Sequence, residues 1–171
     1  MLVLKSSAFA NNGKIPEKYA EKNVVSPPLS WEGVPKGAKS LALVMTDPDV
    51  PEAFNFPRNF FHWILYDIPA SASSLAEGVS PKGALPAGAK ELNSDFVTFG
   101  IPGFGKGYGP PWPPDSEHRY VFTLYALKAA KLGIADTADH AEFCKALLPQ
   151  TILTATLVGL YGPAKSKLPG T

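Results

Sequence analysis

The chain has 171 residues, of which 45% are hydrophobic and 18% are charged, and its formal net charge at pH 7 is +1. This length suits one domain with a sizeable core, and the charge, without a Lys/Arg cluster, gives no electrostatic basis for binding nucleic acid. The single cysteine excludes an intrachain disulfide, the apolar stretch before Lys5 is too short for a secretory signal, and no run reaches the length of a membrane span. We expect one cytoplasmic domain over residues 1–171.

Proline is unusually frequent, with 18 residues spread from Pro16 to Pro169 between strongly apolar runs. Proline fixes φ and removes a backbone donor, so this chain is a poor candidate for a helix bundle. The pattern favours a mainly β protein whose strands are joined by long, stiff loops.

Three apolar runs predict strands, in chain order at 40–46, 60–68 and 119–127. The first is closed by Asp47-Pro48 and the second by Pro69, and the third is rich in β-branched and aromatic residues. Both faces of each run are apolar, which is typical of central strands that other layers cover. Residues 1–9 and 95–99 are weaker strand candidates.

Helix is expected only in the C-terminal third. Asp139 and Glu142 have the spacing of a capping box, and Phe143, Ala146 and Leu147 follow at helical spacing until Pro149 ends the helix. Residues 151–161 are compatible with a second helix, although their threonines and Gly159 leave a strand as the alternative.

Two acidic residues, Asp47 and Asp49, end the first predicted strand in a proline-containing loop, and His62 enters the second. A histidine inside an apolar run is expected to be buried, and a buried imidazole needs a hydrogen-bond partner. Asp47 or Asp49 is a candidate for that partner.

A second polar segment precedes the third strand. Its loop, residues 105–114, contains four prolines that hold one shape at little ordering cost. His118 and Tyr120 then face the same side of the strand, and Arg119 faces the other side, where we expect it to form a structural ion pair.

Together these segments provide two imidazoles, two carboxylates and a phenol at the mouths of apolar strands. Imidazole and phenol groups donate hydrogen bonds, which suits an anion such as phosphate or a carboxylate. An aspartate beside a histidine orients the ring and favours its charged form. The sequence therefore predicts an anion pocket.

Four stretches in order resemble the phosphatidylethanolamine-binding family, which includes the Raf kinase inhibitor proteins and the prokaryotic YbhB/YbcL type: NVVSPPLSW at 23–31, TDPDVP at 46–51, His62, and GPPWPPDSEHRY at 109–120. The resemblance extends from about Val3 to Tyr161. It departs from the family where animal members often carry a second histidine, here Phe61, and where bacterial members often carry an arginine, here Pro163.

The resemblance implies an antiparallel β-sandwich-like core with C-terminal helices. It also implies a pocket for phosphate or small carboxylates, with Asp49 in a structural role behind it and Trp112 in its loop. The residues that it places in the pocket are Asp47, His62, Gly109, Pro111, His118 and Tyr120.

We expect a binding protein without enzymatic activity, cofactor or metal, whose ligand is the phosphate or carboxylate of a small molecule, lipid head group or phosphorylated peptide. One alternative is a protease or kinase inhibitor that acts through its stiff loop surface, and the resemblance is also compatible with a homodimer. A second alternative is a hydrolase with a metal or a His–Asp base, although neither an HExxH nor a GxSxG motif is present. His140 is expected to lie on the surface.

Overall fold

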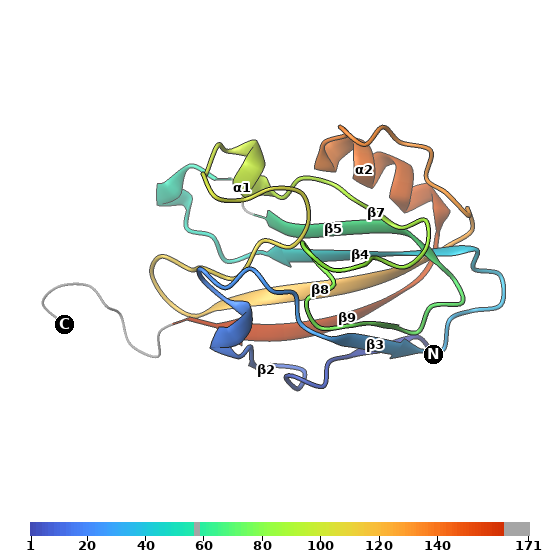
Figure 1. Cartoon of the computed structure of the whole chain (residues 1–171), viewed down its shortest axis with the longest axis horizontal. Helices are drawn as coiled ribbons and strands as arrows, with labels where there is room; N and C mark the ends of the chain where they lie inside the picture. The colour runs from blue at the N-terminus through green and yellow to red at the C-terminus, as the bar shows by residue number, and fades with distance from the viewer. Residues whose placement is uncertain (57–58, 163–171) are drawn as a thin grey trace, which may run out of the picture.

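The computed structural model describes residues 1–56 and 59–162. Strands dominate it (Figure 1). The strands are β1 (Val3–Lys5), β2 (Gly13–Lys14), β3 (Leu29–Glu32), β4 (Ser40–Asp47), β5 (Phe60–Pro69), β6 (Ser74–Leu75), β7 (Lys90–Glu91), β8 (His118–Leu127) and β9 (Thr151–Tyr161). The helices are α1 (Asp95–Thr98) and α2 (His140–Leu147), with 3-10 turns η1 (Glu17–Tyr19), η2 (Glu52–Phe54) and η3 (Leu148–Gln150).

Two sheets form the framework. Strands β2-β9-β8-β4-β5-β7 make a six-stranded sheet in that order, and β1-β3-β6 make a small three-stranded sheet. All neighbours are antiparallel except β2 and β9. The mainly β, sandwich-like class predicted from the sequence is confirmed.

Strands β4 and β5 are buried on both faces, as their sequences predict, whereas β8 is fully buried on one face and only partly buried on the other. One face of the large sheet carries Leu43, Met45 and Phe122, which belong to the main core shared with Leu4 and Trp31 of the small sheet. The other face buries a second cluster under α2, whose members include Val44, Ile64, Tyr66, Phe143 and Leu147. Figure 1 shows α2 on one side of the large sheet and β3 on the other. The large sheet is thus the middle layer.

Helix α2 begins where the capping box predicts. The Asp139 side chain accepts a hydrogen bond from the backbone N–H of Glu142 at 2.8 Å, and the helix ends at Leu147, two residues before Pro149. Asp139 thereby satisfies one of the free N–H groups of the first turn.

Three segments differ from the sequence prediction. Residues 151–161 form strand β9 rather than a helix, because they pair with nearly the whole length of β8, and their β-branched residues suit that pairing. Residues 95–99, predicted as a weak strand, instead contain the short helix α1, and only Val3–Lys5 of the predicted strand at 1–9 is extended in a sheet.

Within residues 1–56 and 59–162, no helix is long and apolar enough to cross a membrane.

Candidate functional site

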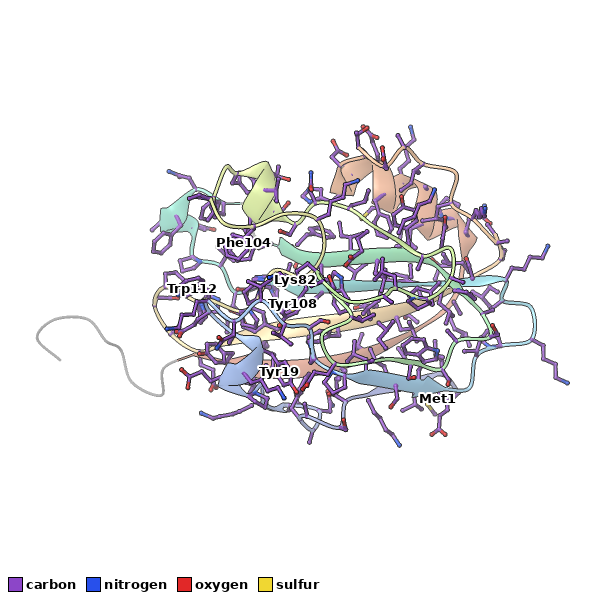
Figure 2. The ribbon with its side chains drawn as sticks, in the orientation of Figure 1. Met1, Tyr19, Lys82, Phe104, Tyr108 and Trp112 are labelled. Atoms are coloured by element: carbon purple, nitrogen blue, oxygen red, sulfur yellow. The ribbon has the colours of Figure 1, made fainter. Side chains whose placement is uncertain are left out.

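A pocket of about 160 Å³ opens at the end of the large sheet where β4 ends and β5 and β8 begin. Turn η2, helix α1 and the loop before β8 surround it at that end of the molecule, and Figure 2 shows Trp112 on this loop. Its lining consists of Asp47, Val50, Phe54, Phe56, Phe60, His62, Phe96, Ile101, Trp112, Pro113, Pro114, His118 and Tyr120.

A β-bulge in β5 turns His62 into this pocket. Met45 of β4 pairs with Trp63, whereas the next residue, Thr46, pairs with Phe61, so His62 is the extra residue between them. Trp63 faces the main core, and regular alternation would have turned His62 toward the α2 face instead. Bulges commonly re-aim one side chain next to a functional site, and here the bulged residue is a pocket histidine.

The partner of His62 is a backbone carbonyl rather than the predicted carboxylate. Its Nδ1 lies 2.8 Å from the carbonyl oxygen of Gly109, whose own N–H donates to the carbonyl of His62 at 2.7 Å. Burial lowers the pKa of His62 to about 4, so the ring is neutral at pH 7. A neutral ring that donates Nδ1–H to Gly109 has Nε2 as an acceptor. His62 therefore does not supply the positive charge that we expected of it.

His118 is the charged imidazole of the pocket. Its Nδ1 lies 2.7 Å from Oδ2 of Asp47 and its Nε2 lies 2.7 Å from Oδ1 of Asp115. Burial opposes the charge, but the hydrogen bonds and charges of the two carboxylates outweigh it and raise the pKa of His118 above its usual value. In the protonated ring both N–H groups donate to carboxylates, which are acceptors only.

Tyr120 lines the pocket and keeps its hydroxyl buried. The side chain is fully buried, and its hydroxyl makes no hydrogen bond of standard geometry among the residues that the structure describes, although the Asp47 carboxylate and the backbone of Trp112 lie close to it. Burial and the nearby Asp47 raise the pKa of Tyr120, so the group stays protonated and able to donate. A buried polar group without a partner costs free energy, which a ligand that accepts this hydrogen bond would recover.

The two aspartates of the TDPDVP segment have different partners. Asp47 accepts the backbone N–H of Asp49 at 2.8 Å in addition to its contact with His118. Asp49 binds the guanidinium of Arg119 through two side-chain hydrogen bonds of 2.7 and 2.9 Å, which lower the pKa of Asp49. The structural ion pair predicted for Arg119 is confirmed, and Asp49 holds the loop behind Asp47.

About half of the residues that line the pocket are Phe, Trp or Tyr, a concentration that the sequence reasoning missed. The rings of Phe60, Phe96 and Tyr120 lie 5.0 to 5.2 Å from the ring of His62. Phe54 and Trp112 are each about half exposed at the rim, at 47% and 49%. The concentration of phenylalanine at 54–61 was the available signal.

The remaining predicted residues play less direct parts. Gly109 and Pro111 are not in the lining of the pocket as the described residues make it, but Gly109 positions His62. A Cβ on Gly109 would lie 2.6 Å from the ring of Phe96, so a glycine is required there. His140, expected on the surface, is half-buried with Nδ1 3.2 Å from Oδ1 of Asp95. Pro163 lies outside the described residues.

Among residues 1–56 and 59–162, no group of three or more His, Cys, Asp and Glu side chains is arranged to hold a metal ion.

Comparison with known proteins identifies the family of this chain. The family model described as "Phosphatidylethanolamine-binding protein" matches residues 5–162. The chain belongs to the phosphatidylethanolamine-binding protein family. Among curated relatives, a UPF0098 protein of Methanothermobacter thermautotrophicus is 38% identical over 159 residues, which cover 92% of this chain and 97% of the relative. A UPF0098 protein of Chlamydia trachomatis is 38% identical over the same shares of both chains.

Solved structures of family members have the same fold. The crystal structure of CT736 from Chlamydia trachomatis, described as a putative phosphatidylethanolamine-binding protein homolog, aligns with a TM-score of 0.80 at 37% identity, covering 95% of this chain and 97% of that one. The structure of YbcL from E. coli, described as a member of the mammalian family, aligns with a TM-score of 0.83 at 28% identity, covering 95% and 98%. The resemblance inferred from the sequence is confirmed.

Proposed function

We propose that this chain is a non-enzymatic binding protein whose pocket holds the anionic group, a carboxylate or phosphate, of a small molecule, a lipid head group or a phosphorylated peptide. The observation that carries the proposal is the pair of donors in one small pocket: the unpartnered hydroxyl of Tyr120 and the charged ring of His118. The family membership supports a binding role.

The Asp115 contact is a second support. His118 Nε2 lies 2.7 Å from a carboxylate oxygen of this chain, which gives a direct example of the kind of atom that the nitrogen binds. A hydrogen bond between charged groups is stronger than a neutral one, so His118 is the stronger of the two donors for an oxyanion.

The apolar wall of the pocket suits the organic part of a ligand that carries the anionic group. Phe54, Phe56 and Trp112 offer apolar surface beside the polar atoms. Pockets that combine an apolar lining with a few polar groups bind small organic molecules, in which the polar groups fix the orientation. The preferred ligand therefore carries an anionic group on an apolar or aromatic body.

The absence of catalysis is part of the proposal. The lining that the described residues make contains no serine, threonine or cysteine to act as a nucleophile beside the histidines. The carboxylate of Asp115 also contacts Nε2 of His118, the ring nitrogen that does not contact Asp47, so this nitrogen is not free to act as a base.

Replacing Tyr120 with Phe tests the proposal because it removes only the buried hydroxyl. We expect Tyr120→Phe to weaken binding of acetate and of methyl phosphate about tenfold, the value of one hydrogen bond to a charged group. Affinity is measured by NMR chemical-shift titration of the labelled protein with each anion.

Tyr66→Phe is the matched control. Tyr66 is also buried with an unpartnered hydroxyl among the described residues, but it packs under α2 on the other face of the sheet. We expect wild-type affinity from this variant. Equal affinities for Tyr120→Phe and wild type, or no binding of either anion by wild type, would rule out the pocket as an anion site.

A further inference from the structure

His118 lies between two carboxylates that are held very differently. The side chain of Asp47 is 4% exposed, and it also accepts a hydrogen bond from the backbone N–H of Asp49. The side chain of Asp115 is 39% exposed, and its other hydrogen bond comes from its neighbour Ser116, at 3.3 Å. Asp47 is thus fixed at the end of the sheet, whereas Asp115 lies on the more exposed loop before β8.

The position of Asp115 bears directly on ligand access. Because Nδ1 of His118 is committed to Asp47, Nε2 is the remaining N–H of the ring, and Asp115 already accepts it. An external oxyanion that binds the same N–H must share it with Asp115 or take its place. Two carboxylates at one donor repel each other, which favours replacement over sharing.

We propose that Asp115 is a tethered competitor, which occupies the position of the ligand's anionic group at His118 Nε2 and leaves when the ligand binds. The proposal rests on the proposed function of the pocket as an anion site.

The surroundings of Asp115 allow this exchange. It follows Pro113 and Pro114, which line the pocket, and precedes His118 by three residues in a loop without helix or strand. A partly exposed carboxylate regains its hydration when it swings into solvent, so displacing it costs far less than displacing Asp47. Binding is then reduced by the fraction of molecules in which Asp115 covers Nε2.

Removing Asp115 also has an effect that opposes the gain in affinity, and the experiment must separate the two. Its charge helps to raise the pKa of His118, so removing it makes the ring lose its proton at a lower pH. A pH below the usual histidine pKa of about 6.5 favours the protonated ring in wild type and variant alike. Affinities are therefore compared at about pH 6, where acetate is ionised.

The test compares Asp115→Asn with wild type and with Glu117→Gln, using acetate and NMR titration. Glu117 is the matched control, because it carries the same charge in the same loop but pairs with Lys14, at 3.3 Å. We expect Asp115→Asn to bind acetate about fivefold more tightly, which corresponds to a partly exposed ion pair of about 1 kcal/mol. Glu117→Gln should bind as wild type does. Asp115→Ala, which leaves no acceptor at this position, should gain at least as much.

Each alternative outcome is informative. Wild-type affinity in both Asp115 variants, or weaker binding, would overturn the proposal and assign Asp115 to holding the loop, while acetate binding itself would remain. An equal gain in Glu117→Gln would overturn it in favour of a general charge effect. Failure of all variants and of wild type to bind acetate would overturn the proposed function and this inference with it.

Discussion

Two histidines share one pocket but hold different charge states. The ring of Tyr120 lies 5.2 Å from that of His62 and 6.4 Å from that of His118. His62 is surrounded by aromatic rings and bonded to a neutral carbonyl, so burial lowers its pKa. His118 is also almost inaccessible to solvent, but its two carboxylates outweigh the effect of burial. The carboxylate partners of His118, which His62 lacks, favour the charged form of that ring.

The pH dependence of acetate binding follows from this difference. Near His118, Asp49 is paired with Arg119 and Glu117 with Lys14, and burial lowers the pKa of His62 to about 4, so that His62 stays neutral around pH 7. Because the pKa of His118 is raised, the ring stays charged below its usual value of about 6.5 and loses its proton only at higher pH. Acetate affinity should therefore be constant from about pH 5.5 to 6.5 and fall in a single step above that range.

Calorimetric titration across this range measures the step, and His140→Ala, which removes the histidine outside the pocket, should show the same profile. A flat profile, or a midpoint below the usual histidine pKa, would show that His118 does not supply the charge.

The sequence predicted which residue types the pocket contains better than it predicted how they pair. His118 and Tyr120 could be placed together, because two positions on one strand share a face. The pairing of His62 could not be predicted, because it depends on a bulge opposite Met45 and Thr46 that has no local signal. Asp115 was missed because its contact depends on the path of an irregular loop.

At the scale of elements, the apolar runs predicted β4, β5 and β8 within a few residues of their observed bounds. Strand β9 was left open between helix and strand, because its rows of leucine and threonine fit a helical spacing as well as a strand. The partner strand decides between them: β8 offers a complete ladder, and Gly159 allows Ile15 to pack where a Cβ would lie 2.5 Å from its side chain. Such long-range contacts override local propensity.

Helix α2 should contribute to stability without affecting the pocket. Asp139→Ala removes the cap of its first turn, which we expect to lower the free energy of unfolding by about 1 kcal/mol. Acetate affinity should not change, because α2 packs on the sheet face opposite Tyr120. Urea denaturation gives the first quantity and NMR titration the second.

Asp139→Ser, which keeps a capping oxygen, is the control and should restore most of the loss. A change in acetate affinity in Asp139→Ala would show that the two faces of the sheet are coupled.

At the scale of the whole molecule, the architecture separates stability from binding. The main core and the cluster under α2 bury both faces of the large sheet. The pocket lies beyond the ends of β4, β5 and β8, where loops rather than neighbouring strands close the structure. Binding residues on loops around a rigid sheet can vary with little effect on the core. Under the proposed function, this end of the fold is the one that binds ligand.

A crystal structure of the protein with acetate, compared with one grown without carboxylates or phosphate, tests the central claim most directly. The account predicts an acetate oxygen within hydrogen-bonding distance, about 3 Å, of both the Tyr120 hydroxyl and Nε2 of His118. A pocket that holds only water at acetate concentrations that saturate the NMR titration, or acetate bound elsewhere with the Tyr120 hydroxyl still unpartnered, would contradict it.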